Sequence, residues 1–413
     1  MKALYNLAGN ARDPISSRAA IVLPGGGARG AYQAGVLSGI AELFDPDVPV
    51  PFPIIAGTSA GAMNAAYLAT QMQNFRATTS RLGELWSNLS VGEVYRAEYR
   101  KIFGVVLRWL WSFISGGRGD GNSRALLDNS PLRELLAANL DFPAIQRHID
   151  AGLLRGLAVT IAGYTSERSL TYFQAARGIE PWWRERREGR PAEMTLDHIM
   201  ASLALPIVFP AVKLGKEWCG DGSTRQLAPL SSPIHLGADR ILVIDTHHHR
   251  PSSSIFDARA ATYPSLSRIG GYLLDTIFSD SLSADLERAE RINRVLEHIS
   301  PAMIEPEIPQ VRSVETLVIA PSRGPGKIAA RHIAALPKGV RWMLRSLGGE
   351  EEGGDVLLSY LLFQDVYCQE LIELGRRDAL ARTDDLRRFF DLRRTVVVPT
   401  EASPVNVSNE SAS

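Results

Sequence analysis

The sequence Gly57-Thr58-Ser59-Ala60-Gly61 follows a short apolar run, residues 52–56, and precedes an alanine-rich stretch that is typical of a helix. A G-x-S-x-G pattern between a strand and a helix predicts a nucleophile elbow with Ser59 at its tip. Gly57 and Gly61 flank the serine because a Cβ at either position would collide with the neighbouring strand or helix. Ser59 would then lie at a helix N-terminus, which favours a developing anion. The alternative is that Ser59 is an ordinary N-cap of a tight turn.

A glycine-rich loop lies upstream of this elbow. Ala19–Leu23 is a short apolar run typical of a buried strand, and it continues into Pro24-Gly25-Gly26-Gly27-Ala28-Arg29-Gly30 and then into a helical pattern. Successive glycines leave backbone N–H groups uncovered, so the loop is suited to hold an oxyanion or a nucleotide phosphate. Gly25, Gly27 and Gly30 also satisfy the G-x-G-x-x-G dinucleotide fingerprint.

The dinucleotide interpretation requires an acidic residue about 20 positions further on, at the end of the second strand. Glu42, Asp45 and Asp47 come earlier, in a proline-containing turn before that strand. The second strand ends instead in the serine elbow. These positions favour an oxyanion-binding role for the glycine loop over a nucleotide site.

An aspartate in a glycine-flanked turn lies downstream, in Trp218-Cys219-Gly220-Asp221-Gly222-Ser223. A serine hydroxyl needs a base to become a nucleophile, and a desolvated carboxylate nearby can serve as that base. Asp221 is therefore the candidate base. The alternative is an aspartate that merely forms a turn beside glycine.

Together these motifs resemble the patatin-like phospholipases. The resemblance covers about residues 17–247 and rests on four motifs in order: PGGGARG at 24–30, GTSAG at 57–61, ASLALPIVFP at 201–210 and DGS at 221–223. Residues 126–132 and, more loosely, residues 357–363 are also similar to segments of the family, the latter to the C-terminal helical extension of bacterial members.

The resemblance implies a Ser–Asp dyad that cleaves ester bonds of acyl lipids, with no metal and no organic cofactor. It implies an oxyanion hole formed by the glycine loop, with a basic residue that holds the loop or offsets negative charge. The implied site residues are Ser59 and Asp221 of the dyad, Gly25, Gly26, Gly27 and Arg29 of the oxyanion loop, Gly57 and Gly61 of the elbow, and Gly222 of the Asp motif.

Two positions depart from the family pattern. Residue 24 is Pro where plant members carry Asp, and residue 223 is Ser where Gly or Ala is usual. A hydroxyl at Ser223 could hydrogen-bond the Asp221 carboxylate and lower its basicity, which would reduce activity.

The histidines permit a rival mechanism. His247, His248 and His249 follow an apolar strand pattern at residues 240–245, and the order Ser59, Asp221, His247 fits that of an α/β-hydrolase triad. The simpler interpretation is that the three histidines lie in a solvated loop. A metal site is disfavoured because no H-x-x-x-H spacing is present.

Composition excludes several classes of protein. Lys+Arg and Asp+Glu both number 45, so net charge gives no indication of nucleic-acid binding. Two cysteines, Cys219 and Cys368, are typical of a reducing compartment, and the sequence shows neither a signal peptide nor a transmembrane run. We expect a cytoplasmic protein. The sequence carries no indication of oligomeric state, lipid head group or chain length.

Alternating strand and helix patterns predict an α/β fold of three layers, with a central, mostly parallel sheet and helices on both faces. The strands are expected at residues 19–23, 54–56, 156–161 and 241–245, with another at 316–320 on the sheet edge. The expected organisation is an N-terminal arm (1–16), a catalytic domain (17–247), a linker (248–262), a mostly helical extension (263–399) and a disordered tail (400–413).

Three stretches suggest peripheral contact with a membrane. Residues 101–114 and 182–187 combine aromatic and cationic side chains, and residues 316–349 carry six Lys/Arg and no acid. The alternative for each is a core element with a solvated charged edge. Two rival functions also remain at this point: a catalytically weak lipid-binding or regulatory protein, and a nucleotide-binding enzyme that uses the glycine loop.

Overall fold

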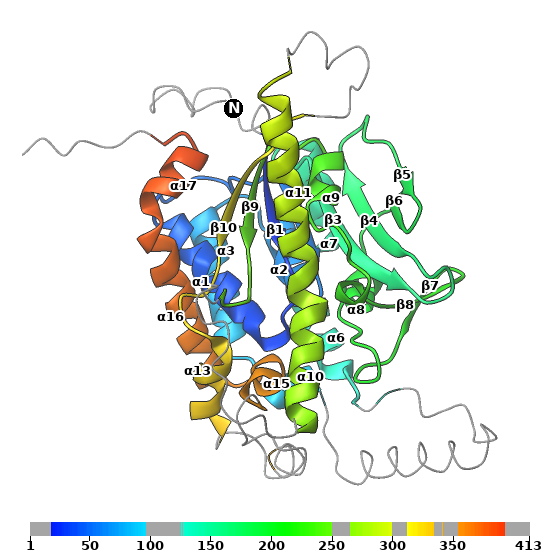
Figure 1. Ribbon diagram of the computed structural model, residues 1–413, viewed down its shortest axis with the longest axis vertical. Coiled ribbons are helices and arrows are strands. Elements are labelled where there is room, and N and C mark those ends of the chain that lie inside the picture. Colours follow the sequence, from blue (N-terminus) through cyan, green and yellow to red (C-terminus); the bar gives the residue numbers. More distant parts are fainter. Residues whose placement is uncertain are drawn as a thin grey trace, which may run out of the picture.

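The centre of the protein is a ten-stranded mixed sheet, seen in a computed structural model that describes residues 18–95, 127–249, 265–299, 312–333 and 354–392, with residues 125 and 341 (Figure 1). The strand order is β10-β9-β1-β2-β3-β4-β6-β5, and β8 pairs with both β3 and β7. The strands are β1 (Ala19–Leu23), β2 (Ile54–Thr58), β3 (Gly156–Gly163), β4 (Ser169–Ala175), β5 (Trp182–Arg184), β6 (Arg187–Pro191), β7 (Val212–Leu214), β8 (Glu217–Asp221), β9 (Arg240–Ile244) and β10 (Glu315–Ile319).

Five neighbouring strands, β10, β9, β1, β2 and β3, are parallel. β1 and β2 are buried along their whole length, as strands covered on both faces are, which explains their uninterrupted apolar sequences. The expected strands are confirmed to within two residues at each end. β10 lies at the edge of the sheet, as expected from its position after the helical stretch.

Helices cover both faces of this sheet (Figure 1). They are α1 (Gly30–Ala41), α2 (Ala60–Thr70), α3 (Phe75–Ser87), α4 (Val91–Val94), α6 (Ser130–Asn139), α7 (Phe142–Asp150), α8 (Leu196–Ser202), α9 (Ser231–His235), α10 (Leu266–Asp275), α11 (Ser281–Leu296), α13 (Pro325–Arg331), α15 (Gly354–Leu361), α16 (Asp365–Ala381) and α17 (Thr383–Phe389). Short 3₁₀ turns η1 (Gly27–Arg29) and η2 (Gly222–Thr224) and a π-helical segment η4 (Thr276–Asp280) complete the elements.

Successive side chains along each strand point to opposite faces of the sheet, and this divides the apolar interior into two cores. Ile21 and Leu23 of β1 face a large core that contains residues of α1, α2, α3 and α16. Ala20 and Val22 face a smaller core that includes Leu230, beside α9, and Leu282 of α11. The prediction of a three-layer α/β fold with helices on both faces is therefore confirmed.

The C-terminal helices pack directly on the sheet domain. α16 crosses α1 where both helices carry glycine: a Cβ on Gly35 would lie 2.0 Å from the carbonyl oxygen of Ile372, and one on Gly375 would lie 2.3 Å from that of Tyr32. Arg376 also pairs with Glu42 at 2.6 Å. The predicted boundaries at residues 247 and 263 remain predictions, but the two parts share one apolar core.

Several sequence predictions concern surfaces. Residues 1–16, 101–114, 250–262 and 400–413 lie outside the described residues. The expected interfacial role of residues 182–187 is wrong for Trp182, which is 6% exposed in β5 and stacks between Phe173 and His235, with ring centroids at 4.9 and 4.4 Å. Trp183 is exposed.

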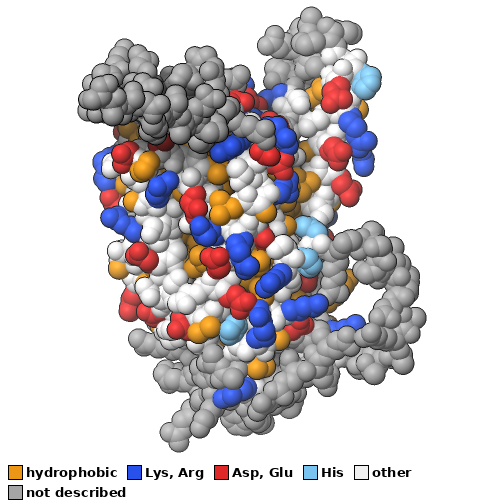
Figure 2. All heavy atoms as spheres, turned by 90° about the vertical axis from the view of Figure 1, so that its left-hand side faces the viewer, with side chains coloured by type: hydrophobic (Ala, Val, Ile, Leu, Met, Phe, Trp, Pro, Cys, Tyr) orange, Lys and Arg blue, Asp and Glu red, His pale blue; other side chains and the backbone are white. Residues whose placement is uncertain are grey.

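The face that carries α13 and α16 shows charges of both signs intermingled (Figure 2). Arg331, one cation of the predicted basic stretch, is paired with Glu370 of α16. This pairing weakens the expectation that the stretch attracts anionic head groups. Among the described helices, none combines the length and apolar character needed to cross a bilayer.

The glycine crossing of α1 and α16 makes a prediction about stability. Gly35→Ala should destabilise the protein by about 2–3 kcal/mol, because the new methyl group meets backbone atoms that cannot move independently. Gly83→Ala is the matched control within α3, where a Cβ meets nothing within 4 Å. That change should stabilise the protein by about 0.5–1 kcal/mol. Denaturant unfolding of both variants measures the difference, and equal effects would contradict the packing argument.

Candidate active site

Ser59 occupies a strained turn between β2 and α2. Its φ of 54° and ψ of −129° lie where non-glycine residues are rarely found, as is typical of a functional turn. The flanking glycines are required by close packing: a Cβ on Gly57 would lie 2.4 Å from the Gly61 carbonyl oxygen, and one on Gly61 would lie 1.9 Å from that of Leu23. The geometry of this turn matches the predicted elbow.

Asp221 reaches Ser59 through the register of the sheet. Thr58 of β2 pairs with Thr160 of β3, and the next residue, Ile161, pairs with Asp221 at the end of β8. The Ser59 hydroxyl donates a hydrogen bond of 2.5 Å to Oδ2 of Asp221, although the two residues are 162 positions apart. Both side chains are buried, Asp221 at 1% exposure.

Gly222 makes this approach possible. A Cβ at this position would lie 2.2 Å from the carbonyl oxygen of Thr160. The glycine therefore lets the turn after β8 lie directly against β3. This is the physical reason for glycine after the aspartate.

Ser202 is a site residue that the sequence analysis quoted within a motif without assigning a role. Its hydroxyl accepts a hydrogen bond of 2.9 Å from the Ser59 backbone N–H and donates one of 2.7 Å to the Thr160 carbonyl. Two residues on, the Ala204 carbonyl accepts from the Asp221 N–H at 2.8 Å. The end of α8 thus fixes the backbones of both Ser59 and Asp221.

Burial raises the pKa of Asp221 to about 6, against the opposing effect of hydrogen bonds from Ser59 and Ser223. The Ser223 backbone N–H donates to Oδ1 of Asp221 at 2.9 Å. The Ser223 hydroxyl is buried and makes no hydrogen bond among the described residues. The carboxylate is therefore held by the backbone of residue 223, and its raised pKa suits a general base.

The glycine loop lies beside Ser59, and Gly27 lines the same cavity. Its glycines are closely covered by later parts of the chain. A Cβ on Gly25 would lie 2.5 Å from the Phe278 ring and from the Ser223 hydroxyl, and one on Gly27, whose φ is 55°, would lie 2.4 Å from the Tyr360 carbonyl oxygen. The loop is thus shaped both by the Asp221 turn and by the C-terminal helices.

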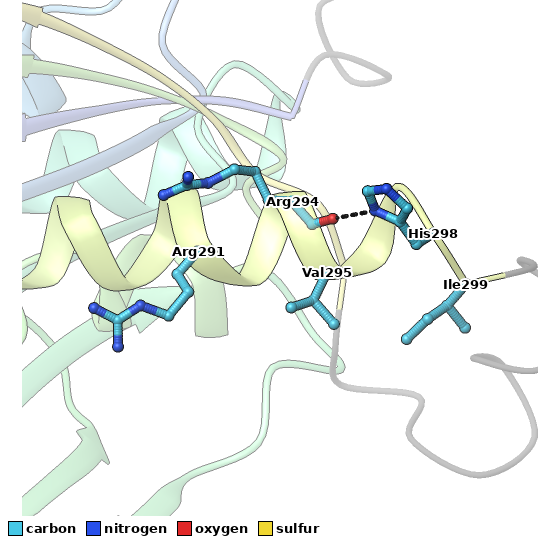
Figure 3. A pocket seen from close by; sticks show the side chains of 5 residues that line it. All are labelled: Arg291, Arg294, Val295, His298 and Ile299. Carbon is cyan, nitrogen blue, oxygen red and sulfur yellow. Dashed lines mark hydrogen bonds between the residues drawn. The ribbon is translucent and has the colours of Figure 1, made fainter.

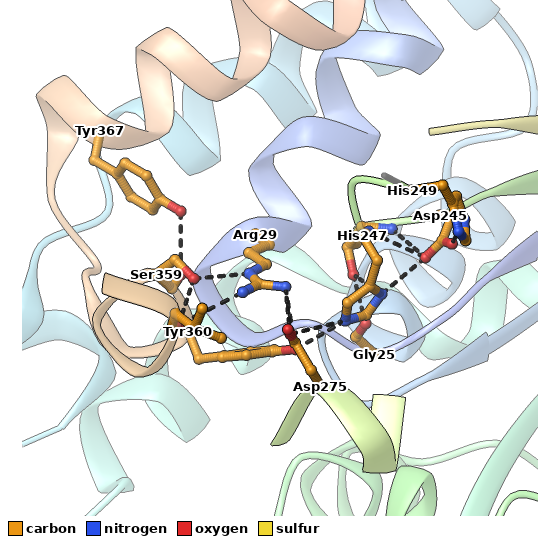
Figure 4. A network of polar contacts seen from close by, with 11 residues as sticks. Gly25, Arg29, Asp245, His247, His249, Asp275, Ser359, Tyr360 and Tyr367 are labelled. Atoms are coloured by element: carbon orange, nitrogen blue, oxygen red, sulfur yellow. Dashed lines mark hydrogen bonds and ion pairs between the residues drawn. The ribbon is translucent and has the colours of Figure 1, made fainter. Parts of the chain in front are cut away.

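Arg29 is committed to the C-terminal helices (Figure 4). It is 3% exposed and donates to the Ser359 hydroxyl at 2.8 Å, to Asp275 at 3.1 Å and to the Tyr360 hydroxyl at 3.1 Å. Its guanidinium also lies 3.8 Å from the Tyr360 ring centroid. Of the two expected roles, this geometry fits a residue that holds the loop.

His247 belongs to the same network (Figure 4). Its Nδ1 lies 2.9 Å from Asp245 and its Nε2 lies 2.8 Å from the Tyr360 hydroxyl. Burial of Asp245 would by itself raise the pKa of its carboxyl group. Hydrogen bonds from His247 and His249 outweigh this effect and hold that pKa below its usual range. His247 is 5% exposed, so the solvated-loop interpretation is wrong for this residue. Both of its ring nitrogens contact residues other than Ser59.

The cavity at Ser59 and Asp221 is apolar and small, about 60 Å³. Its lining combines residues of the sheet domain with residues of the C-terminal helices. The first group includes Met63, Trp86, Leu132, Leu203, Leu205 and Phe209, and the second is Leu274, Phe278, Tyr360, Leu361 and Phe363. No pattern in the sequence predicts that the second group lines this cavity.

A second, open concavity of about 620 Å³ lies at the C-terminal end of α11 (Figure 3). It is lined by Arg291, Arg294, Val295, His298 and Ile299. α10, η4 and α11 form one continuous helical rod, and the concavity lies at the end of this rod opposite to α10 (Figure 1). It contains neither the serine nor the aspartate of the candidate site.

The site thus joins a sharp serine turn to a desolvated aspartate on a mostly parallel sheet. The chain belongs to the patatin-like phospholipase family, because a sequence model of that family matches residues 21–234, just over half of the 413 residues. Its fold is patatin-like with C-terminal helices.

Other comparisons are more distant. No curated protein matches the chain. A similar solved structure is that of human group IVD cytosolic phospholipase A2 in complex with methyl gamma-linolenyl fluorophosphonate. The TM-score is 0.38 and the identity 10%, with 92% of this chain and 60% of that chain covered, so this chain spans about 60% of that protein's length.

The buried Asp221 predicts a pH-dependent effect on stability. Its pKa of about 6 exceeds the ordinary 3.8, so the folded state binds the proton more tightly than the unfolded chain does. The resulting stability is fully present below pH 3.8 and is lost as pH rises through about 6. Asp221→Asn should therefore gain about 2–2.5 kcal/mol in unfolding free energy, relative to wild type, between pH 4 and pH 8. Denaturant unfolding at both pH values measures this, and a gain independent of pH would contradict it.

Proposed function

We propose that this protein is a serine acyl hydrolase that cleaves ester bonds of phospholipids, lysophospholipids or related acyl lipids through a Ser59–Asp221 dyad. The observation that carries the proposal is the 2.5 Å hydrogen bond from the Ser59 hydroxyl to a buried carboxylate at an apolar cavity. A desolvated carboxylate with a raised pKa is a stronger base than an exposed one, which compensates for the absence of a histidine.

In the proposed reaction the Ser59 oxygen attacks the ester carbonyl while Asp221 accepts its proton. Backbone N–H groups of Gly25–Gly27 stabilise the tetrahedral oxyanion, and the proton passes to the departing alcohol as the acyl-enzyme forms. Water then attacks the acyl carbonyl while Asp221 accepts its proton. The bond between the acyl group and the Ser59 oxygen breaks, the fatty acid leaves, and Asp221 returns the proton to the Ser59 oxygen, which restores both residues.

The cavity lining supports an acyl substrate. Apart from Gly27, Ser59 and Asp221, its lining is aliphatic, aromatic or thioether, which suits a hydrocarbon chain. The rival nucleotide site gains no support, because Phe278 and Tyr360 lie against the glycine loop where phosphates would approach. The rival of a catalytically weak binding protein predicts an unreactive Ser59 and is tested directly below.

Removal of either dyad member should abolish turnover. With mixed phospholipid vesicles and no added metal, wild type should release free fatty acid and lysolipid, measured by mass spectrometry. Ser59→Ala and Asp221→Asn should each lower the rate by roughly 10³-fold or more, because removing a member of a nucleophile–base pair leaves only binding and oxyanion stabilisation. A fluorophosphonate should label Ser59 in wild type. Wild-type turnover in either variant would exclude the dyad.

The network around Arg29 predicts a role for Tyr360. Tyr360→Phe removes a hydroxyl that contacts Arg29, Asp275 and His247. The oxyanion loop should lose its fixed position, lowering kcat by about tenfold with little change in KM. Tyr367→Phe is the matched control, since among the described residues that hydroxyl hydrogen-bonds to the Ser359 carbonyl alone, at 3.2 Å. Steady-state kinetics separate the two, and equal loss in both would assign the effect to packing.

A further inference from the structure

α10 presents apolar side chains on two opposite sides. Leu274 lines the cavity at Ser59, as does Phe278 one turn later in the π-helical segment. At 3.6 residues per turn, Ile269 and Tyr272 lie about 140–160° around the helix from Leu274. On this outer side Ile269, Tyr272 and Leu273 are 37%, 70% and 53% exposed. The helix that closes the cavity from within is therefore apolar outside as well.

A second exposed apolar side chain lies on a strained loop beside the same cavity. Ile207 is 57% exposed and has a φ of 73°, which is costly for a β-branched residue. Leu205 and Phe209, two residues away on either side, both line the cavity. An exposed isoleucine held in a strained backbone contributes nothing to the core, and such strain is concentrated at functional sites.

We propose that the outer side of α10 (Ile269, Tyr272 and Leu273) and Ile207 together form a docking surface for a lipid aggregate. The inference rests on the proposed function, because it states that the lipid substrate of the Ser59 site is taken from an aggregate such as a vesicle. Apolar side chains that enter the lipid would place the cavity next to the acyl chains, so that a lipid could pass from one to the other without crossing water.

The dimensions of the cavity favour this partner. A volume of about 60 Å³ is well below the roughly 300–1,000 Å³ of sites that enclose a ligand. A long acyl chain must therefore displace part of the lining, and Leu274 and Phe278 belong to the helix that carries the docking surface. A protein partner fits less well, because four side chains are far fewer than the roughly 20–30 residues a side of a stable interface.

Co-sedimentation with phosphatidylcholine vesicles tests the docking surface without requiring turnover. The variant Ile269→Gln/Tyr272→Gln/Leu273→Gln keeps helix propensity and removes the apolar side chains. We expect its vesicle partition to fall at least about tenfold, with little dependence on salt, because the contact is apolar. The Ser59→Ala background should bind like wild type, since that change leaves the surface intact.

The far end of the same helical rod supplies the matched control. Ile292, Val295 and Ile299 are 42%, 55% and 39% exposed on or just after α11. Figure 3 shows Val295 and Ile299. Their triple replacement by Gln should change vesicle partition by less than about twofold, as expected for surface changes away from the contact. An equal loss in both triple variants, or no loss in the α10 variant, would overturn the proposal.

Ile207→Asn separates docking from stability. Asparagine tolerates positive φ better than isoleucine, so this variant should unfold at a higher denaturant concentration than wild type. If Ile207 docks on lipid, the more stable variant should nevertheless bind vesicles several-fold more weakly. Unchanged vesicle binding would remove Ile207 from the docking surface and contradict the proposal in that part.

Activity on two substrates distinguishes failure of this inference from failure of the proposed function. The α10 variant should hydrolyse a soluble monomeric p-nitrophenyl ester at the wild-type rate and vesicle lipid at least about tenfold more slowly. Equal hydrolysis of both substrates would refute docking and leave the dyad intact. If the fluorophosphonate did not label Ser59 and no ester were hydrolysed, the proposed hydrolase function would be wrong. Vesicle co-sedimentation would still show whether the docking surface binds lipid.

Discussion

The hydrogen bond between Ser59 and Asp221 is the interaction on which the rest of the site depends. A carboxylate is a useful base for a serine only if water is kept away from it, and here it is 1% exposed. Desolvation of that kind is costly, so the surrounding backbone must be held firmly. The register of β2, β3 and β8 brings the pair together, and Ser202 and Ala204 fix the two backbones.

The oxyanion loop depends on parts of the chain far from it. Arg29 connects the loop to Asp275 and Tyr360, which lie 246 and 331 residues away. Tyr360 belongs to α15, and α16, which follows α15 in the chain, crosses α1 closely at Gly35 and Gly375. Helix packing on one face of the sheet and loop geometry at its carboxyl edge are therefore parts of a single arrangement.

Much of this could be predicted from sequence, for identifiable physical reasons. β1 and β2 are uninterrupted apolar runs beside glycine-rich turns, and such runs have few alternative structures. Ser59 and Asp221 stand in short motifs whose glycines are required by contacts within 2.5 Å. The roles of Tyr360 and Asp275 could not be predicted, because they arise from side chains that meet only after the chain has folded. His247 was misjudged for the same reason: a histidine after a strand is indistinguishable, in sequence, from one in a solvated loop.

β10 lies at the outer edge of the sheet, beside β9. It pairs with β9 along all five residues of each strand and so covers the backbone of a strand whose interior residues are fully buried. A chain that lacked β10 would expose the edge of β9, and one that also lacked α16 would expose the side of α1 that carries Gly35 and Gly39. Open edges of this kind recruit other strands. The edge of the sheet is instead β10, a five-residue strand that begins with the exposed Glu315, and short edge strands with charged side chains disfavour pairing with other molecules.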